Sequence, residues 1–161
     1  MTASPDAVEV LARLQARGWT VGVAESLTGG LVVASLIDVP GASAWVRGGV
    51  VAYATELKHR ILGVDAVLLA EHGPVHPDVA RQMAEGVRAA TTTADGPADV
   101  GIATTGIAGP TSPDGQPVGT VHVGVATPEG TQVVSAVLSG NRDDIRHDAV
   151  RLALRAAIGA L

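Results

Sequence analysis

The sequence predicts an α/β fold: a three-layer α/β/α sandwich around a mixed, mostly parallel sheet of about five or six strands. Two short, nearly all-apolar segments, Thr20–Ala24 and Asp99–Gly106, are typical of strands buried on both faces of a sheet. Segments with apolar residues at helical spacing alternate with such strands, and a hairpin pattern around "TPEGT" follows late in the chain. This order favours helices on both faces of one mixed sheet.

The overall composition limits the classes of protein that remain. A chain of 161 residues, 47% hydrophobic and 17% charged, suits one folded domain spanning residues 1–161. The net charge of −5 and the scattered Lys and Arg residues argue against nucleic-acid binding. The sequence shows neither a secretory signal nor an apolar run of membrane-spanning length, so we expect a cytoplasmic protein without a membrane partner. The absence of Cys excludes a thiolate nucleophile.

The first third of the chain predicts helix, strand, helix and strand. Apolar residues recur at helical spacing over Pro5–Arg17, and Ser4 is the expected N-cap. The strand Thr20–Ala24 follows, and a helix of one or two turns begins after "SLTGG" and ends near Pro40. Segment Ala44–Tyr53 predicts a second strand, in which a pair of glycines indicates a bulge or a close backbone approach.

The remainder predicts further helices, strands and a final long helix. The segment "TELKHRIL" is a predicted helix with Thr55 as its N-cap, and a longer amphipathic helix begins at His76. A third strand covers Asp99–Gly106, and the segments "TVHVGVA" and "QVVSAVL" form the hairpin. The last helix is expected from Arg142 to Leu161.

The stretch "VGVAESLTGG" contains the first candidate site. Ser26 lies at the carboxyl end of a buried strand, where ligands bind in open α/β sheets, and directly before a helix. The backbone N–H groups of Thr28, Gly29 and Gly30 can bind a phosphate there, or stabilise an oxyanion beside a nucleophilic serine. The alternative is that Ser26 is only an N-cap and the glycines only form a turn.

A second candidate site lies in "YATELK". Tyr53 ends the second strand, and Lys58 follows five residues later in the first turns of a helix. A lysine that is desolvated near a serine can act as the general base of a Ser-Lys hydrolase. The alternative is an ordinary solvated lysine against which the tyrosine ring packs.

The glycine- and proline-rich loop "TTGIAGPTSPDGQPVG" is a third candidate. It follows the hydroxyl of Thr105, and Gly106 and Gly109 allow a ligand to approach the backbone closely, although a rigid surface loop is the alternative. Arg142 is the fourth candidate, because a cation at a helix start is unfavourable with the helix dipole and therefore suggests an anion-binding role. We interpret the segment from Arg146 to Arg151 as a solvated charged face.

Metal and cofactor sites are not predicted. His72 and His76 are separated by Gly73-Pro74, which prevents a helical pair of ligands, and the other histidines are isolated in the sequence. We therefore expect no metal and no cofactor.

Together, these stretches resemble the CinA C-terminal domain family in order and spacing. The resemblance rests on "AESLTGG", "GGVVAYATELKHRILGV", "EHGPVHPDVA", "GIAGPTSPDGQPVGTVHVGVA" and "NRDDIRHDAVRLAL", and it extends from about Val8 to the C-terminus. The family includes stand-alone nicotinamide-nucleotide amidases. The resemblance implies a three-layer α/β/α fold, hydrolysis of nicotinamide mononucleotide to nicotinic acid mononucleotide and ammonia, no metal, and assembly as a homo-oligomer.

The resemblance also implies roles for individual residues. The motif positions of the family fall on Ser26, Tyr53, Lys58, Thr105 and Arg142. This chain departs from the usual motifs at four places. The glycine-rich loop is shorter at Ser112-Pro113-Asp114, Leu27 replaces a cysteine, Ala54-Thr55 replace a Ser-Asn pair, and Asn141 replaces an aspartate. The last two departures bear on substrate preference.

The resulting hypothesis is an amidohydrolase of the Ser-Lys type. Ser26 attacks the carboxamide, Lys58 moves the proton, and Tyr53 orients Lys58 or packs on the pyridine ring. The expected binding groups are the amides of Thr28, Gly29 and Gly30 for the oxyanion, and Thr105, Gly106, Gly109 and Arg142 for ribose and phosphate. Ser43 is an alternative nucleophile or a substrate-binding residue, because it too precedes the Tyr53 strand. The rival hypothesis is a non-catalytic nucleotide-binding module of the same family.

Overall fold

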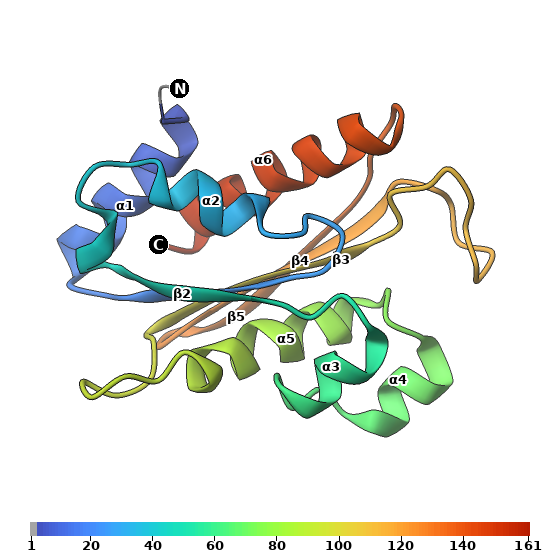
Figure 1. The fold of residues 1–161 in the computed structure, drawn as a ribbon, viewed down its shortest axis with the longest axis horizontal. Helices are drawn as coiled ribbons and strands as arrows, with labels where there is room; N and C mark the ends of the chain where they lie inside the picture. The colour runs from blue at the N-terminus through green and yellow to red at the C-terminus, as the bar shows by residue number, and fades with distance from the viewer. Residues whose placement is uncertain (1–2) are drawn as a thin grey trace.

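The computed structural model describes residues 3–161, which form one five-stranded sheet covered by helices on both faces (Figure 1). In chain order the elements are α1 (Pro5–Arg17), β1 (Val21–Glu25), α2 (Leu31–Ile37), the 3-10 helix η1 (Ala42–Ala44), β2 (Val46–Val51), α3 (Thr55–Arg60), α4 (Ala66–His72), α5 (Pro77–Ala90), β3 (Val100–Gly106), β4 (Thr120–Thr127), β5 (Gly130–Val137) and α6 (Arg142–Ala160).

The sheet is mixed, with the strand order β2-β1-β3-β4-β5. Strands β2, β1 and β3 are parallel, whereas β4 is antiparallel to β3 and to β5. Strand β5 therefore runs in the same direction as the first three, and only β4 is reversed. Helices α1, α2 and α6 cover one face of the sheet, and α3, α4 and α5 cover the other (Figure 1). The predicted three-layer α/β/α architecture is confirmed.

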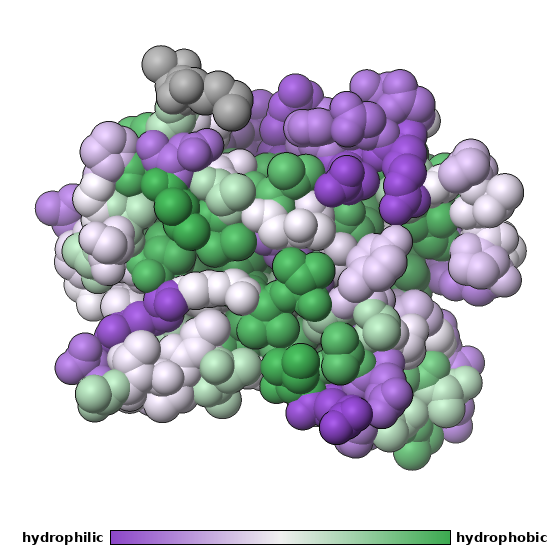
Figure 2. Space-filling model, in the orientation of Figure 1, coloured by the Kyte–Doolittle hydropathy of each residue, from purple (hydrophilic) through white to green (hydrophobic). Residues whose placement is uncertain are grey.

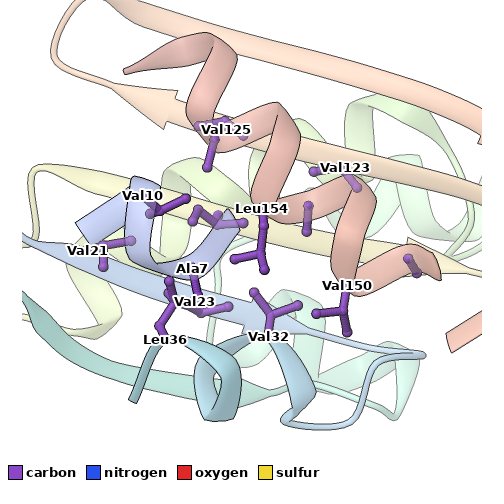
Figure 3. Close-up of a cluster of buried hydrophobic side chains, with 14 of the residues drawn as sticks. Ala7, Val10, Val21, Val23, Val32, Leu36, Val123, Val125, Val150 and Leu154 are labelled. Carbon is purple, nitrogen blue, oxygen red and sulfur yellow. The ribbon is translucent and has the colours of Figure 1, made fainter. Parts of the chain in front are cut away.

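The core is built almost entirely from small and branched aliphatic residues. Figure 3 shows Val21 and Val23 of β1, together with Val125 of β4, beside Leu154 of α6 on one face of the sheet. On the other face, α5 packs directly on the sheet backbone, because a Cβ added to Gly124 would lie 2.3 Å from a carbonyl oxygen of that helix. Such close layers leave the strand ends, rather than the faces, as the place for a ligand.

Some local predictions differ from the structure. Helix α4 was not expected, and Thr55 is the first residue of α3 rather than its N-cap, which is Ala54. The bulge expected in β2 is present, because the ladder between β1 and β2 passes from Val46 to Gly48 and skips Arg47.

The surface is polar along the outer side of α6 (Figure 2). Apolar side chains gather where β2, an edge strand, passes α2 and α3 (Figure 2). Each of these elements has an exposed large apolar residue at its carboxyl end: Ile37 in α2, Val51 in β2 and Ile61 at the C-cap of α3. Within residues 3–161, no helix has both the length and the apolar character needed to cross a bilayer. The expected homo-oligomer stays a prediction.

Candidate active site

The first candidate site forms at the carboxyl end of β1, between two parallel neighbours. Strand β1 ends at Glu25, and α2 begins at Leu31. The intervening β1–α2 turn, residues 26–30, requires left-handed backbone at Gly29 (φ 61°) and Gly30 (φ 102°), a conformation that glycine adopts without strain. The two glycines of "LTGG" thus shape a tight turn that carries Ser26.

Glu25 explains why an apolar strand ends on a carboxylate. Its side chain is fully buried, and Oε2 accepts the N–H groups of Gly30 (3.0 Å) and Val32 (3.1 Å). Its Oε1 accepts the N–H of Val33 (2.9 Å). The carboxylate therefore satisfies the first free amides of α2 and lies at the positive end of the helix dipole. Glu25 fixes the turn and does not reach the reacting groups.

The capping by Glu25 corrects the predicted oxyanion site. The N–H of Gly30 is donated to Glu25, and the N–H of Gly29 is donated to the carbonyl of Ser26 (3.1 Å). Neither amide is available to a ligand. Within the described residues, the amides of Leu27 and Thr28 have no hydrogen-bond partner, and Leu27 also lines the cavity beside Ser26. The Leu27 amide is therefore the better placed donor in this turn.

Ser26 and Lys58 meet in a nearly solvent-free position. Ser26 is 8% exposed and Lys58 is 1% exposed, and Lys58 Nζ lies 3.0 Å from Ser26 Oγ. The amine also donates to the carbonyl oxygens of Ala52 (2.7 Å) and Tyr53 (3.4 Å). No carboxylate among the described residues forms an ion pair with it. Lys58 is also the only lysine in the sequence.

The surroundings of Lys58 favour its neutral form. Burial lowers the pKa of the Lys58 amine from 10.5 to about 8, because the charged form loses its hydration. A neutral amine has two N–H donors and one lone pair. The two carbonyl oxygens accept the two donors, which leaves the lone pair for the hydroxyl proton of Ser26. This arrangement is what a general base next to a nucleophile requires.

The other predicted residues surround a cavity of about 220 Å³ next to this pair. The structure brings together seven of the predicted side chains and loop positions: Ser26, Tyr53, Lys58, Thr105, Gly106, Gly109 and Arg142. The elements that supply them are far apart in sequence and meet at the carboxyl ends of β1, β2 and β3, as is typical of open α/β sheets.

Arg142 and Tyr53 form the exposed rim of the cavity. Arg142 Nη1 donates to the carbonyl of Gly109 (2.7 Å), and Nη2 lies 3.3 Å from the Tyr53 hydroxyl. Tyr53 is 61% exposed, and it is its carbonyl, not its phenol, that contacts Lys58. Thr105 lies deeper and donates its hydroxyl proton to the carbonyl of Pro74 (2.6 Å). The rim can therefore contact a ligand through a cation, Arg142, and an aromatic ring, Tyr53.

Four predicted residues do not line this cavity: Thr28, Gly29, Gly30 and Ser43. Ser43 lies in η1, which precedes β2, so it is at the amino end of that strand, roughly 20 Å from Tyr53 by the length of the strand. It lines a different cavity, together with Arg47. The structure therefore does not place Ser43, predicted as an alternative nucleophile or substrate-binding residue, beside Ser26 and Lys58. The Thr28 hydroxyl is hydrogen-bonded to Oγ1 of Thr104 in the neighbouring strand β3 (2.7 Å).

Arg146 was missed by the sequence prediction. It was expected on a solvated charged face, but its Nε donates to the carbonyl of Leu27 (2.9 Å) and its Nη2 to that of Thr28 (3.3 Å). The available signal was its position four residues after Arg142, because residues at that spacing share one face of a helix.

The histidines between residues 3 and 161 do not belong to any cluster of possible metal ligands. No group of three or more His, Asp or Glu side chains between residues 3 and 161 can hold a metal ion. His122 Nδ1 is 2.7 Å from Ser135 Oγ, and burial, assisted by the nearby His76, lowers the pKa of the His122 imidazole.

Comparisons with known proteins agree with the fold described above and identify a family. The family model described as the CinA C-terminal domain matches residues 4–161. The chain is 51% identical over 145 residues to a CinA-like protein of Frankia casuarinae, covering 90% of this chain and 32% of that protein. It is also 51% identical over 155 residues to a CinA-like protein of Anaeromyxobacter dehalogenans, covering 91% and 36%. The chain spans about a third of the length of these relatives.

Solved structures match over nearly the full chain. The competence damage-inducible protein A from Klebsiella pneumoniae superposes with a TM-score of 0.90 at 34% identity, covering 99% of this chain and 96% of that chain. A CinA superfamily protein from Enterobacter cloacae also gives a TM-score of 0.90, at 29% identity, with coverages of 99% and 92%.

Proposed function

The chain belongs to the CinA C-terminal domain family, and on that premise we propose that it is a serine amidohydrolase acting on nicotinamide mononucleotide. Its products are nicotinic acid mononucleotide and ammonia, a step of pyridine nucleotide salvage. One observation carries the proposal: Lys58 is buried without an acidic partner, and its Nζ lies 3.0 Å from Ser26 Oγ. A buried lysine with this geometry is costly unless its neutral form is used.

The acylation step uses both residues. Ser26 Oγ attacks the carboxamide carbon, and its proton passes to Lys58 Nζ. The tetrahedral oxyanion accepts a hydrogen bond from the Leu27 amide, which has no other partner among the described residues. When the C–N bond breaks, Lys58 returns the proton to the leaving nitrogen, and ammonia departs. The acid half of the substrate stays on Ser26 as an ester.

Deacylation repeats the sequence with water. Lys58, neutral again, takes a proton from a water molecule that attacks the ester carbon. Collapse of the second tetrahedral intermediate breaks the bond to Ser26 Oγ, and Lys58 supplies the proton that restores the hydroxyl. The net reaction consumes one water and needs no redox partner or cofactor.

The cavity suits a carboxamide on a ring with an anionic tail. The ring enters beside Ser26, next to Thr105 and the loop at Gly106. The phosphate lies at the exposed rim, where Arg142 supplies a cation and Tyr53 an aromatic face. The choice of the pyridine nucleotide rests on the resemblance of the motifs to the nicotinamide-nucleotide amidases of this family.

The test measures ammonia release from nicotinamide mononucleotide by the parent and by S26A. We expect the parent to release ammonia and S26A to lose at least about 10³-fold in kcat. S43A is the matched control: it also removes a serine hydroxyl, but Ser43 lies outside the cavity, so its rate should equal that of the parent.

Other results would contradict parts of the proposal. Ammonia release by S26A at the parent's rate would exclude Ser26 as the nucleophile. A parent that binds the mononucleotide without releasing ammonia would favour the non-catalytic binding module.

A further inference from the structure

We infer that Arg146 is a positioning residue that holds the β1–α2 turn, and with it Ser26, in the reactive geometry. This inference rests on Ser26 being the nucleophile of the proposed function. Arg146 itself does not line the cavity, so any effect on catalysis acts through the turn.

The first line of argument is how the turn is held. The amide side of the turn is bound by the Glu25 carboxylate, and the Thr28 hydroxyl is bound by Thr104. Among the described residues, only Arg146 donates to the carbonyl of Leu27; it also donates to the carbonyl of Thr28, which accepts the N–H of Leu31 as well. Hydrogen bonds from a charged donor are shorter and stronger than neutral ones. Arg146 is thus the side chain that fixes the carbonyl side of the turn.

The second line of argument is how closely the guanidinium fits the turn. A Cβ added to Gly29 would lie 3.3 Å from Arg146 Nη2, so the side chain lies directly against this glycine. Leu27 is 4% exposed and Thr28 is fully buried, so water cannot readily replace the guanidinium on their carbonyls. Without Arg146, the Leu27 carbonyl would have no partner among the described residues, and its peptide group would rotate to find one.

The third line of argument is the connection to the nucleophile. Leu27 directly follows Ser26 in the chain, so a rotation of the Leu27–Thr28 peptide group changes the backbone angles at Leu27 and shifts Ser26 Oγ relative to Lys58 Nζ. Displacements of about 1 Å at reacting groups cost on the order of 10²-fold in rate. Arg142, four residues earlier on α6, contacts the rim of the same cavity. One helix therefore fixes both the rim and the nucleophile.

The experiment measures the reactivity of Ser26 without the natural substrate. Phenylmethanesulfonyl fluoride forms a bond between Ser26 Oγ and sulfur, fluoride leaves, and the hydroxyl proton passes to Lys58. The rate constant of labelling is compared in the parent, R146M, R146K and R151M. Arg151 is the matched control, because it lies on the same helix but pairs with Asp148 on the exposed side.

We expect R146M to lower both the labelling rate constant and kcat for nicotinamide mononucleotide by about 10- to 100-fold. KM should stay within about twofold, R146K should recover part of the rate, and R151M should behave as the parent. A purely structural role would reduce the fraction of protein that can be labelled but not the rate constant of the folded fraction. If R146M does not fold, R146A with millimolar guanidinium ion replaces it, and the added ion should raise the rate.

The outcomes separate this inference from the proposed function. Labelling of R146M at the parent's rate constant would overturn the inference, whether or not the parent releases ammonia. A parent that is labelled at Ser26 but does not deamidate the mononucleotide would overturn the substrate assignment, and the labelling rates would still test Arg146.

Discussion

Replacing Lys58 with Met should change how the stability of the fold depends on pH. The substitution keeps an unbranched side chain of similar length and removes the buried amine, which is 1% exposed in the structure. In the parent, burial lowers the pKa of Lys58 to about 8 from the ordinary 10.5. The unfolded chain therefore holds this proton at pH values where the folded protein has already released it.

The sign and the size follow from these two pKa values. Between about pH 8 and 10.5 the unfolded state binds more protons, so the free energy of unfolding rises with pH across this window. The full difference is about 3 kcal/mol at 1.36 kcal/mol for each pKa unit. Between pH 7 and pH 10, the parent should therefore gain roughly 2 kcal/mol relative to K58M.

Urea unfolding at several pH values measures this difference. The carbonyls of Ala52 and Tyr53 lose a donor in K58M, but that loss does not vary with pH and cancels when the two slopes are compared. Because Lys58 is the only lysine, NMR of protein labelled at lysine gives its pKa from a single side-chain signal.

Two results would refute this reasoning. One is a free-energy difference between parent and K58M that stays constant from pH 7 to pH 10. The other is a lysine signal that titrates near 10.5, because the amine would then be hydrated rather than desolvated. If the reasoning holds, kcat/KM for the proposed reaction should rise with pH through about 8, since the neutral amine is the active form.

Three further predictions concern other residues. R142M should raise KM for nicotinamide mononucleotide about tenfold or more, because the proposed charge-assisted contact of Arg142 is with the phosphate. The KM for nicotinamide riboside, which lacks the phosphate, should change little, and steady-state kinetics with both substrates checks this difference. E25Q should lower the free energy of unfolding by about 2 kcal/mol, because the NH₂ group of the glutamine would face a backbone N–H of the turn or of α2 that the carboxylate now accepts. Urea unfolding measures this loss, and an unchanged unfolding midpoint would contradict the capping role of Glu25. Burial and, to a smaller extent, His76 lower the pKa of His122, so the free energy of unfolding should fall as the pH falls below 6.5. Between pH 7 and pH 5 the melting temperature should drop more in the parent than in H122Q, and equal drops would exclude His122 as the cause.

The sequence allowed the central pair of the site to be predicted because both residues lie at ends of recognisable elements. Ser26 follows an all-apolar strand, and Lys58 lies on the helix after the next strand. The pairing itself was predicted from the family resemblance; in the structure the carboxyl ends of the parallel strands meet, and this brings the two residues together. Ser43 does not meet this condition, because it precedes β2. It therefore lies at the amino ends of the parallel strands, whereas the candidate site lies at their carboxyl ends.

The partners of individual polar groups could not be predicted from the sequence. Glu25 and the glycine amides lie within one short segment, but only the folded turn shows that the carboxylate, rather than a ligand, accepts their protons. Arg146 acts on residues 119 and 118 positions away along the chain. Helix α4 was missed because seven residues are too short to show a helical period clearly.

The position of Tyr53 gives this protein a built-in optical probe. It is the single tyrosine of the chain, phenylalanine is absent, and it lies at the rim beside Arg142. The two tryptophans, Trp19 and Trp45, lie within two residues of the starts of β1 and β2 and are therefore near the other end of the sheet. Near-ultraviolet circular dichroism of the phenol band can therefore report occupancy of the rim from one side chain, without any label or substitution.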